Sequence, residues 1–181
     1  MTLAALICAY HESSEPGDGL RATLALAGRT IVERQARLAA LAGANPVVIL
    51  VERLPPDLTA AIDRMRVEGI GVVVGRSASE GSEAIPVEAR LLLVGDGLIV
   101  DESHIERLLE AEAPALLTMA DNLADDRFER IDAASRWAGL ALLDGGTLRQ
   151  TAAMLHDWGL QSTLLRRALQ AHAPQNAILE T

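Results

Sequence analysis

The sequence predicts an α/β fold, with a single domain built on a mostly parallel sheet and helices on both faces. Short apolar segments bounded by Gly, Pro and polar residues alternate with longer segments whose apolar residues recur at helical spacing. This alternation is typical of strands joined by helical crossovers. The chain has 181 residues, half of them hydrophobic, which is enough for one domain with a substantial core.

The first part of the chain predicts a strand, a long loop and a helix. Residues 3–9 form a short apolar run, and residues 10–19 are polar and contain Gly and Pro. Thr30 then begins a helix, because Glu33 three residues later completes a capping box. We expect this helix to end at about Ala42, before a glycine.

The remaining elements follow the same two patterns. We expect further strands at 46–51, 70–74, 91–94, 115–119 and 137–143, and helices at 58–67, 103–111 and 148–155. A last helix carries Leu164, Leu165 and Ala168 inward and Arg166 and Arg167 outward. Residues 75–86, rich in Gly and Ser, predict a loop with room for a short helical turn, and residues 120–130 predict a loop or hairpin arm.

The charge balance limits the classes of partner. Lysine and arginine total 16 against 25 acids, a net charge of -9, which argues against binding to nucleic acid or to an anionic membrane surface. All 16 cations are arginine, so lysine Schiff-base chemistry is excluded and any cationic contact to phosphate must come from arginine. No basic leader or stretch of about 18 apolar residues occurs, so we expect a cytoplasmic protein without membrane insertion.

The motifs of several other chemistries are missing. Cys8 is the only cysteine and lies in an apolar run, so we expect a buried core residue. The four histidines show no metal-ligand spacing, which argues against a zinc site. No Gly-x-Ser-x-Gly occurs, and no G-x-G-x-x-G follows the first strand, so a hydrolase triad and a dinucleotide oxidoreductase are both disfavoured.

Asp96 is the first candidate for chemistry. It follows the apolar run 91–94, stands between Gly95 and Gly97, and precedes a predicted helix. A buried strand that ends in a glycine-flanked acid places the acid at the carboxyl edge of a sheet, where open α/β folds bind ligands and metal ions. The alternative is an ordinary turn aspartate, since Gly-Asp-Gly is common turn chemistry.

Two segments resemble the GT-A-type nucleotidyltransferases, a superfamily that includes the MobA-like and sugar-phosphate nucleotidyltransferases. LRATLALAGRTIVERQ, residues 20–35, resembles the region after the first strand, where a Gly-rich loop leads to Lys-Pro-Leu, Gly-Arg-Pro-Leu and a helix. The position of the family's phosphate-binding lysine falls on Arg21. VGDGLIVDESHIERLLE, residues 94–110, resembles the strand that ends in a metal-binding aspartate. The resemblance implies a divergent member in which residues 1–181 form one nucleotidyltransferase-like domain.

The resemblance also implies an activity and a site. The enzyme would transfer a nucleotidyl group from a nucleoside triphosphate to a small phosphorylated acceptor and release pyrophosphate. Asp96 would hold Mg²⁺ against the α-phosphate, and Arg21 would stabilise charge on the phosphates, so these two are the catalytic candidates. Gly17 and Gly19 would form the phosphate cradle. Four residues occupy the place where the family contacts the nucleobase: Gly75, Ser77, Gly81 and Ser82. A homo-oligomer is compatible with this assignment.

The first loop departs from the family pattern. Where the family has Ala-Ala-Gly-x-Gly-x-Arg, residues 9–19 read AYHESSEPGDG, and their acids would repel a triphosphate unless a metal intervenes. Residues 174–181 offer only Asn176 and Glu180 as candidates for a second metal ligand. These departures leave open a catalytically degenerate nucleotide-binding or regulatory module of the same fold. A glycosyltransferase of this fold is a third alternative, disfavoured because Asp96 has no Asp-x-Asp partner.

Overall fold

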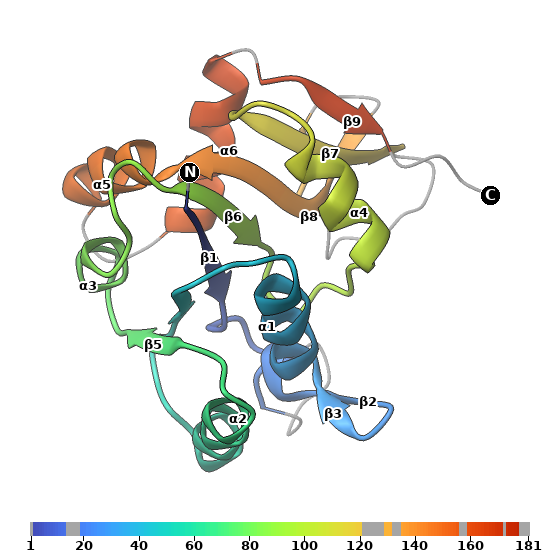
Figure 1. Ribbon diagram of the computed structural model, residues 1–181, viewed down its shortest axis with the longest axis vertical. Coiled ribbons are helices and arrows are strands. Elements are labelled where there is room, and N and C mark those ends of the chain that lie inside the picture. The colour runs from blue at the N-terminus through green and yellow to red at the C-terminus, as the bar shows by residue number, and fades with distance from the viewer. Residues whose placement is uncertain are drawn as a thin grey trace.

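A mixed sheet lies between two layers of helices (Figure 1). The computed structural model describes residues 2–13, 19–120, 129–131, 135–155, 159–171 and 173–177. Within them the sheet has seven strands in the order β5-β4-β1-β6-β8-β7-β9. The predicted fold class is therefore confirmed: an α/β architecture with a mostly parallel sheet and helices on both faces.

The described elements have the following bounds. The sheet contains β1 (Leu3–Cys8), β4 (Val47–Leu50), β5 (Val72–Gly75), β6 (Arg90–Val94), β7 (Ala115–Ala120), β8 (Ser135–Asp144) and β9 (Gln175–Ala177). The helices are α1 (Ile31–Leu41), α2 (Pro56–Val67), α3 (Ala78–Glu83), α4 (Glu102–Leu109), α5 (Gly145–Met154) and α6 (Leu160–Gln170). A 3₁₀ turn (Arg21–Thr23) and a small hairpin of β2 (Ala25–Leu26) and β3 (Arg29–Thr30) lie between β1 and α1. None of the described helices combines the length and apolar composition that crossing a bilayer requires.

The order of the strands creates a switch point beside β1. From β1 the chain builds outward through β4 and β5, and then returns to place β6 on the other side of β1. All four of these strands are parallel, and Ile7 of β1 lies opposite Val94 of β6. The segments that follow β1 and β6 therefore emerge side by side at the carboxyl edge, where open α/β sheets bind ligands. The long β8 runs antiparallel between β6 and β7.

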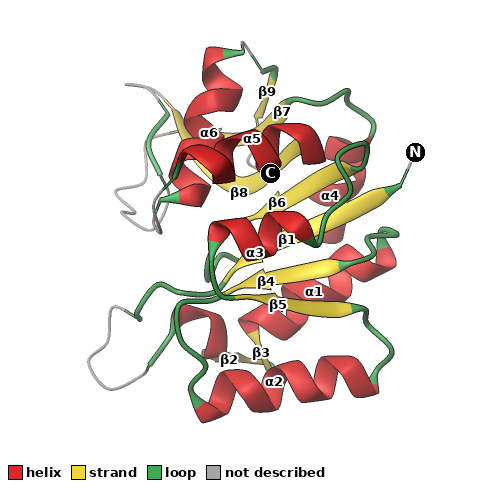
Figure 2. Cartoon of the chain, turned by 90° about the vertical axis from the view of Figure 1, so that its left-hand side faces the viewer, coloured by secondary structure: helices red, strands yellow, loops and turns green. Residues whose placement is uncertain are grey.

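The two faces of the sheet carry separate cores. Helices α1, α2 and α4 pack on one face, and α3, α5 and α6 pack on the other, toward the viewer in Figure 2. Strand β1 serves both, since Ala5 and Ile7 join the first core while Leu6 and Cys8 join the second. Cys8 is fully buried, as predicted. Burial raises the pKa of its thiol, and the charge of Asp96 raises it further, which disfavours the reactive thiolate.

Several elements differ from the sequence predictions. A regular six-residue helix, α3, occupies the middle of the predicted loop 75–86. The β2–β3 hairpin and the edge strand β9 are additional elements, the latter pairing parallel with β7. Most of the predicted loop or arm at 120–130 lies outside the described residues, because residues 121–128 are not among them.

The capping box predicted at the start of α1 is confirmed. The Thr30 hydroxyl accepts the Glu33 N–H at 3.3 Å, and the Glu33 carboxylate accepts the Thr30 N–H at 3.4 Å. Glu33 also accepts a hydrogen bond from Arg64 of α2 at 2.6 Å, so the first turn of α1 is fixed both locally and against its neighbour. This matters for the site because α1 begins directly after the β2–β3 hairpin and packs beside β1.

Replacing Thr30 with alanine is expected to lower the free energy of unfolding by about 0.5–2 kcal/mol, because the helix loses its N-cap acceptor. Urea unfolding followed by circular dichroism measures the effect. Thr59→Ala is the matched control, since Thr59 is exposed inside α2, where alanine is a good helix former. Equal unfolding midpoints for the two variants would contradict the capping role.

Candidate functional site

Asp96 lies in a tight turn at the switch point. The Leu98 N–H reaches the Gly95 carbonyl at 3.4 Å, and Gly97 has a φ of 66°, a left-handed conformation that favours glycine. Asp96 therefore belongs to a turn, as one interpretation of the sequence expects, and its side chain points inward; its role toward a ligand stays a prediction. The side chain is 0% exposed, whereas the neighbouring His11 side chain is 45% exposed.

The two carboxylate oxygens of Asp96 differ in their surroundings. Oδ2 accepts the backbone N–H groups of Tyr10 at 2.8 Å and His11 at 2.7 Å, and the His11 Nδ1 lies 3.3 Å away. Oδ1 is buried and has no hydrogen-bond partner among the described residues. One oxygen thus holds the segment after β1, while the other is a buried acceptor without a partner. Such an oxygen is costly to bury and is a signal of a ligand.

Burial raises the pKa of Asp96 above its ordinary value of 3.8. The N–H groups of His11 and Tyr10 oppose this rise, and so do the charges of His11 and Arg21. A buried carboxylate with its charge only partly balanced is a site that a cation would stabilise.

Arg21 lies beside this turn. Its N–H donates to the His11 carbonyl at 3.0 Å, and its side-chain carbons pack where a Cβ on Gly97 would stand. The positive charge of Arg21 lowers the pKa of Asp96 and so opposes the effect of burial. The structure therefore brings together the two residues that the resemblance singles out, although 75 positions separate them in the sequence, counting from 21 to 96.

The segment after β1 is closed at its base by backbone contacts. Glu12 forms an antiparallel bridge with Leu20, and the Ser13 N–H donates to the Gly19 carbonyl at 2.7 Å. Gly19 has a φ of 74°, a left-handed conformation that favours glycine, and its part in a phosphate cradle stays a prediction. Gly17 lies outside the described residues. Unlike a glycine-rich cradle with free N–H groups, this base uses the described N–H groups of residues 10, 11 and 13 internally.

Of the four residues predicted near a nucleobase, three are buried in the packing of α3 and one lines a cavity. A Cβ on Gly75 would stand 2.8 Å from the Gly81 Cα, so these glycines allow α3 to pack closely on the end of β5. Ser82 is buried, and its hydroxyl donates to the Ser79 carbonyl at 2.9 Å. Ser77 caps α3 by accepting the Glu80 N–H at 3.1 Å, and it also lines a small cavity. Of the four, Ser77 is thus the one that borders open space.

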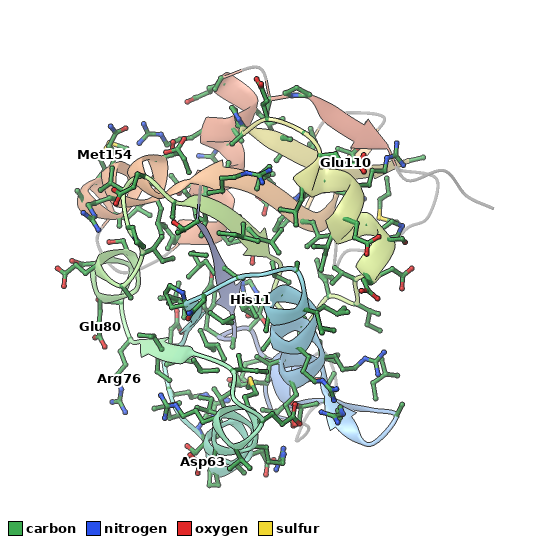
Figure 3. All side chains as sticks on the ribbon, viewed as in Figure 1. His11, Asp63, Arg76, Glu80, Glu110 and Met154 are labelled. Atoms are coloured by element: carbon green, nitrogen blue, oxygen red, sulfur yellow. The ribbon has the colours of Figure 1, made fainter. Side chains whose placement is uncertain are left out.

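This cavity opens at the carboxyl ends of β4 and β5, next to the Asp96 turn. It is lined by Tyr10, Arg76, Ser77 and the start of α6, together with Leu50 at the end of β4 and the two residues that follow it. Figure 3 shows His11 near the middle of the molecule and Arg76 at its margin, beyond the end of β5. The cavity and the Asp96 turn share the Tyr10–His11 segment, since Tyr10 lines the first and its N–H binds the second.

In the described part of the chain, Asp96 stands as a single carboxylate at this edge and does not belong to a cluster of metal ligands. The described residues contain no group of three or more His, Cys, Asp or Glu side chains that could hold one. Asn176 lies in β9, and Glu180 lies outside the described residues. The unpartnered Asp96 Oδ1 nonetheless fits Mg²⁺, which typically binds one or two carboxylates and completes its shell with phosphates and water.

Two buried glutamines, which the sequence analysis did not single out, hold the Asp96 turn. The Gln35 amide of α1 donates to the carbonyls of Gly95 at 2.9 Å and Leu98 at 2.6 Å. The Gln161 side chain of α6 accepts the Asp96 N–H at 3.2 Å. The available signal was position, because Gln35 lies one helical turn after Ile31 on the apolar face of α1.

Among known proteins, this chain is similar to solved structures, whereas the sequence comparisons found no match. No protein-family model matches the sequence, and no curated protein does. The chain is similar to a solved CMP:2-keto-3-deoxy-manno-octonic acid synthetase complexed with CTP, at 15% identity and a TM-score of 0.61, over 98% of this chain and 89% of that one. It is also similar to 4-diphosphocytidyl-2C-methyl-D-erythritol synthase, at 15% identity and a TM-score of 0.59, over 99% of this chain and 89% of that one.

A third solved structure matches in the same way. A nucleotidyl transferase from Methanothermobacter thermautotroptrophicus has a TM-score of 0.64 and 15% identity, over 99% of this chain and 88% of that one. At this level of identity the similarity establishes the fold, which spans nearly the whole chain.

Proposed function

We propose that this protein is a nucleotidyltransferase, which transfers a nucleotidyl group from a nucleoside triphosphate to a small phosphorylated acceptor. The observation that carries the proposal is the buried, unpartnered Oδ1 of Asp96 at the switch point, with Arg21 beside it. The three similar structures support it, because each is named as a synthetase, a synthase or a nucleotidyl transferase, and one is complexed with CTP.

The proposed reaction is an in-line displacement at the α-phosphorus. An acceptor phosphate oxygen attacks the α-phosphorus, a new P–O bond forms, and the bond to the β-phosphate breaks as pyrophosphate leaves with its electron pair. Bound Mg²⁺ on Asp96 Oδ1 would supply charge neutralisation at the α-phosphate. Arg21 would bind phosphate oxygens through its guanidinium, which can engage two oxygens at once. Catalysis of this kind consists of positioning and electrostatics.

We place the base of the nucleotide over the mouth of the cavity lined by Tyr10 and Ser77, because the cavity itself, at about 30 Å³, is too small to enclose a base. The cavity lies at the same edge of the sheet as Asp96 and shares the Tyr10–His11 segment with it. A nucleotide lying across this edge would place its base against the end of β5 and its phosphates at Asp96 and Arg21. Gly75, Gly81 and Ser82 would then act by shaping the wall behind Ser77.

One observation favours a second function, a nucleotide-binding or regulatory module of the same fold that has lost catalysis. The N–H groups of Tyr10 and His11, which a phosphate cradle would present to a triphosphate, are bound by Asp96 itself. The acids of the loop also oppose a triphosphate in the absence of a cation.

A melting panel separates the two functions. The protein is melted with each of the four common nucleoside triphosphates, in Mg²⁺ and in EDTA. A ligand at 100 times its dissociation constant stabilises by about 2.7 kcal/mol, which is readily measured. We expect at least one triphosphate to raise the melting temperature only with Mg²⁺, and pyrophosphate release to follow when phosphorylated sugars and alcohols are added. A shift without pyrophosphate release from any acceptor would favour the module, and no shift with any nucleotide would contradict both.

A further inference from the structure

We propose that Gln35 and Gln161 are positioning residues that hold the Asp96 turn from opposite faces of the sheet. The inference deepens the proposed function and rests on it, since the placement of Asp96 matters for chemistry only if Asp96 binds the metal–nucleotide complex. Neither glutamine faces solvent, as Gln35 is 2% exposed and Gln161 is 8% exposed. Their described hydrogen bonds with the turn all go to its backbone and none to the Asp96 carboxylate, so both act through the backbone of the turn.

Gln35 closes the turn from the α1 side. Its one amide nitrogen donates to the carbonyls of Gly95 and Leu98, the first and last residues of the turn, and so fixes the distance between the two ends. The bond to Leu98 is short, at 2.6 Å. A change in this contact would alter the curvature of the turn and hence the direction of the side chain between its ends.

Gln161 anchors the same turn from the α6 side. Its Oε1 accepts the N–H of Asp96 at 3.2 Å. The Gly95 N–H in turn donates to the Gly139 carbonyl at 2.8 Å, which ties the start of the turn to β8. With α1 and α6 on opposite faces of the sheet, the turn is held from both sides and at its base.

The side chain of Gln35 also has an energetic cost that an apolar core residue would not have. Its Oε1 is buried without a hydrogen-bond partner among the described residues, and an unpartnered buried oxygen lowers stability. An apolar side chain of similar length would fill the same space without this cost. The amide therefore fits a role in holding the two carbonyls rather than a role in filling the core.

The test monitors the turn through the N–H groups of Tyr10 and His11, whose described hydrogen bonds go to Asp96 and not to Gln35. Gln35→Met keeps the length of the side chain and removes both donors. We expect the amide signals of Tyr10 and His11 to shift in ¹H–¹⁵N spectra recorded without nucleotide. We also expect the affinity for the Mg²⁺-triphosphate selected by the melting panel to fall by about 10–100-fold, as for other residues that orient a metal ligand.

Ile62→Val is the matched control, because Ile62 of α2 belongs to the same core as α1 but has no part in the described hydrogen bonds of the turn. It should lower stability and leave both amide signals and the affinity unchanged. If Gln35→Met fails to fold, Gln161→Met is tested by the amide signal of His11, which donates to Asp96 and not to Gln161, and by the same affinity. Unshifted amide signals in a folded variant would overturn the inference. If the wild type binds no Mg²⁺-triphosphate, the proposed function fails, while the amide signals still decide whether the glutamines hold the turn.

Discussion

Replacing Asp96 with alanine is expected to destabilise the protein more than replacing it with asparagine, while both changes abolish the Mg²⁺-dependent response to nucleotide. Both variants remove the charge, but asparagine keeps an oxygen that can accept the Tyr10 and His11 N–H groups. Alanine leaves these two donors without their acceptor, so we expect it to be less stable than asparagine by about 1–3 kcal/mol. Urea unfolding in EDTA measures this difference.

Wild type and the Asp96→Asn variant together test the raised pKa of Asp96. A group whose pKa is higher in the folded than in the unfolded state binds more protons when folded, so its contribution to stability is present at low pH and is lost as the pH rises through the folded value. Above pH 3.8, the ordinary value for this carboxyl, we therefore expect wild type in EDTA to lose stability relative to Asp96→Asn. Parallel pH profiles for the two proteins, or equal stabilities of the Asn and Ala variants, would contradict the environment described for Asp96.

Replacing Gly97 with alanine is expected to have the second large effect. The φ of 66° at this position disfavours any residue with a Cβ, and the new Cβ would collide with the Cβ of Arg21. The left-handed conformation alone costs about 1–2 kcal/mol, and the forced displacement of Arg21 adds roughly 1–3 kcal/mol. Because Arg21 must move away from the turn, the Mg²⁺-dependent melting shift with nucleotide should also be lost.

Gly28→Ala is the control that separates the backbone strain of a positive φ from the collision with Arg21. Gly28 has a φ of 82°, and no atom lies within 4 Å of the position of an added Cβ. This variant should show the cost of the left-handed conformation alone and keep the nucleotide response. Equal losses of stability in the two variants, measured as unfolding free energies, would show that Arg21 does not pack against the turn.

Local signals were sufficient to predict much of the fold. The capping box of Thr30 and Glu33 acts over four consecutive residues, so it can be recognised without knowledge of the fold. The polar strand β9 could not be recognised in this way, because three residues show no periodicity and its pairing with β7 depends on contacts far along the chain. The β2–β3 hairpin was missed although Ala27 and Gly28, both with positive φ, form its turn.

The candidate site was also predictable only where its signals are local in the sequence. The Gly-Asp-Gly sequence after an apolar run indicated where Asp96 would lie, since the carboxyl edge of a strand follows from the order of elements. Which groups surround the carboxylate could not be predicted, because the Tyr10 and His11 N–H groups reach it across 86 and 85 positions of sequence. The Gln35 contacts with the turn likewise span 60 and 63 positions.

The most direct test of the account is a crystal structure of the protein with Mg²⁺ and a non-hydrolysable analogue of the triphosphate that gives the largest melting shift. We expect Mg²⁺ at about 2.0–2.1 Å from the Asp96 Oδ1, with further oxygens from the α-phosphate and water. The Arg21 guanidinium should contact the phosphates, and the base should lie over the mouth of the cavity lined by Tyr10 and Ser77. A nucleotide bound elsewhere, or bound at this edge with no metal on Asp96, would contradict the proposed site.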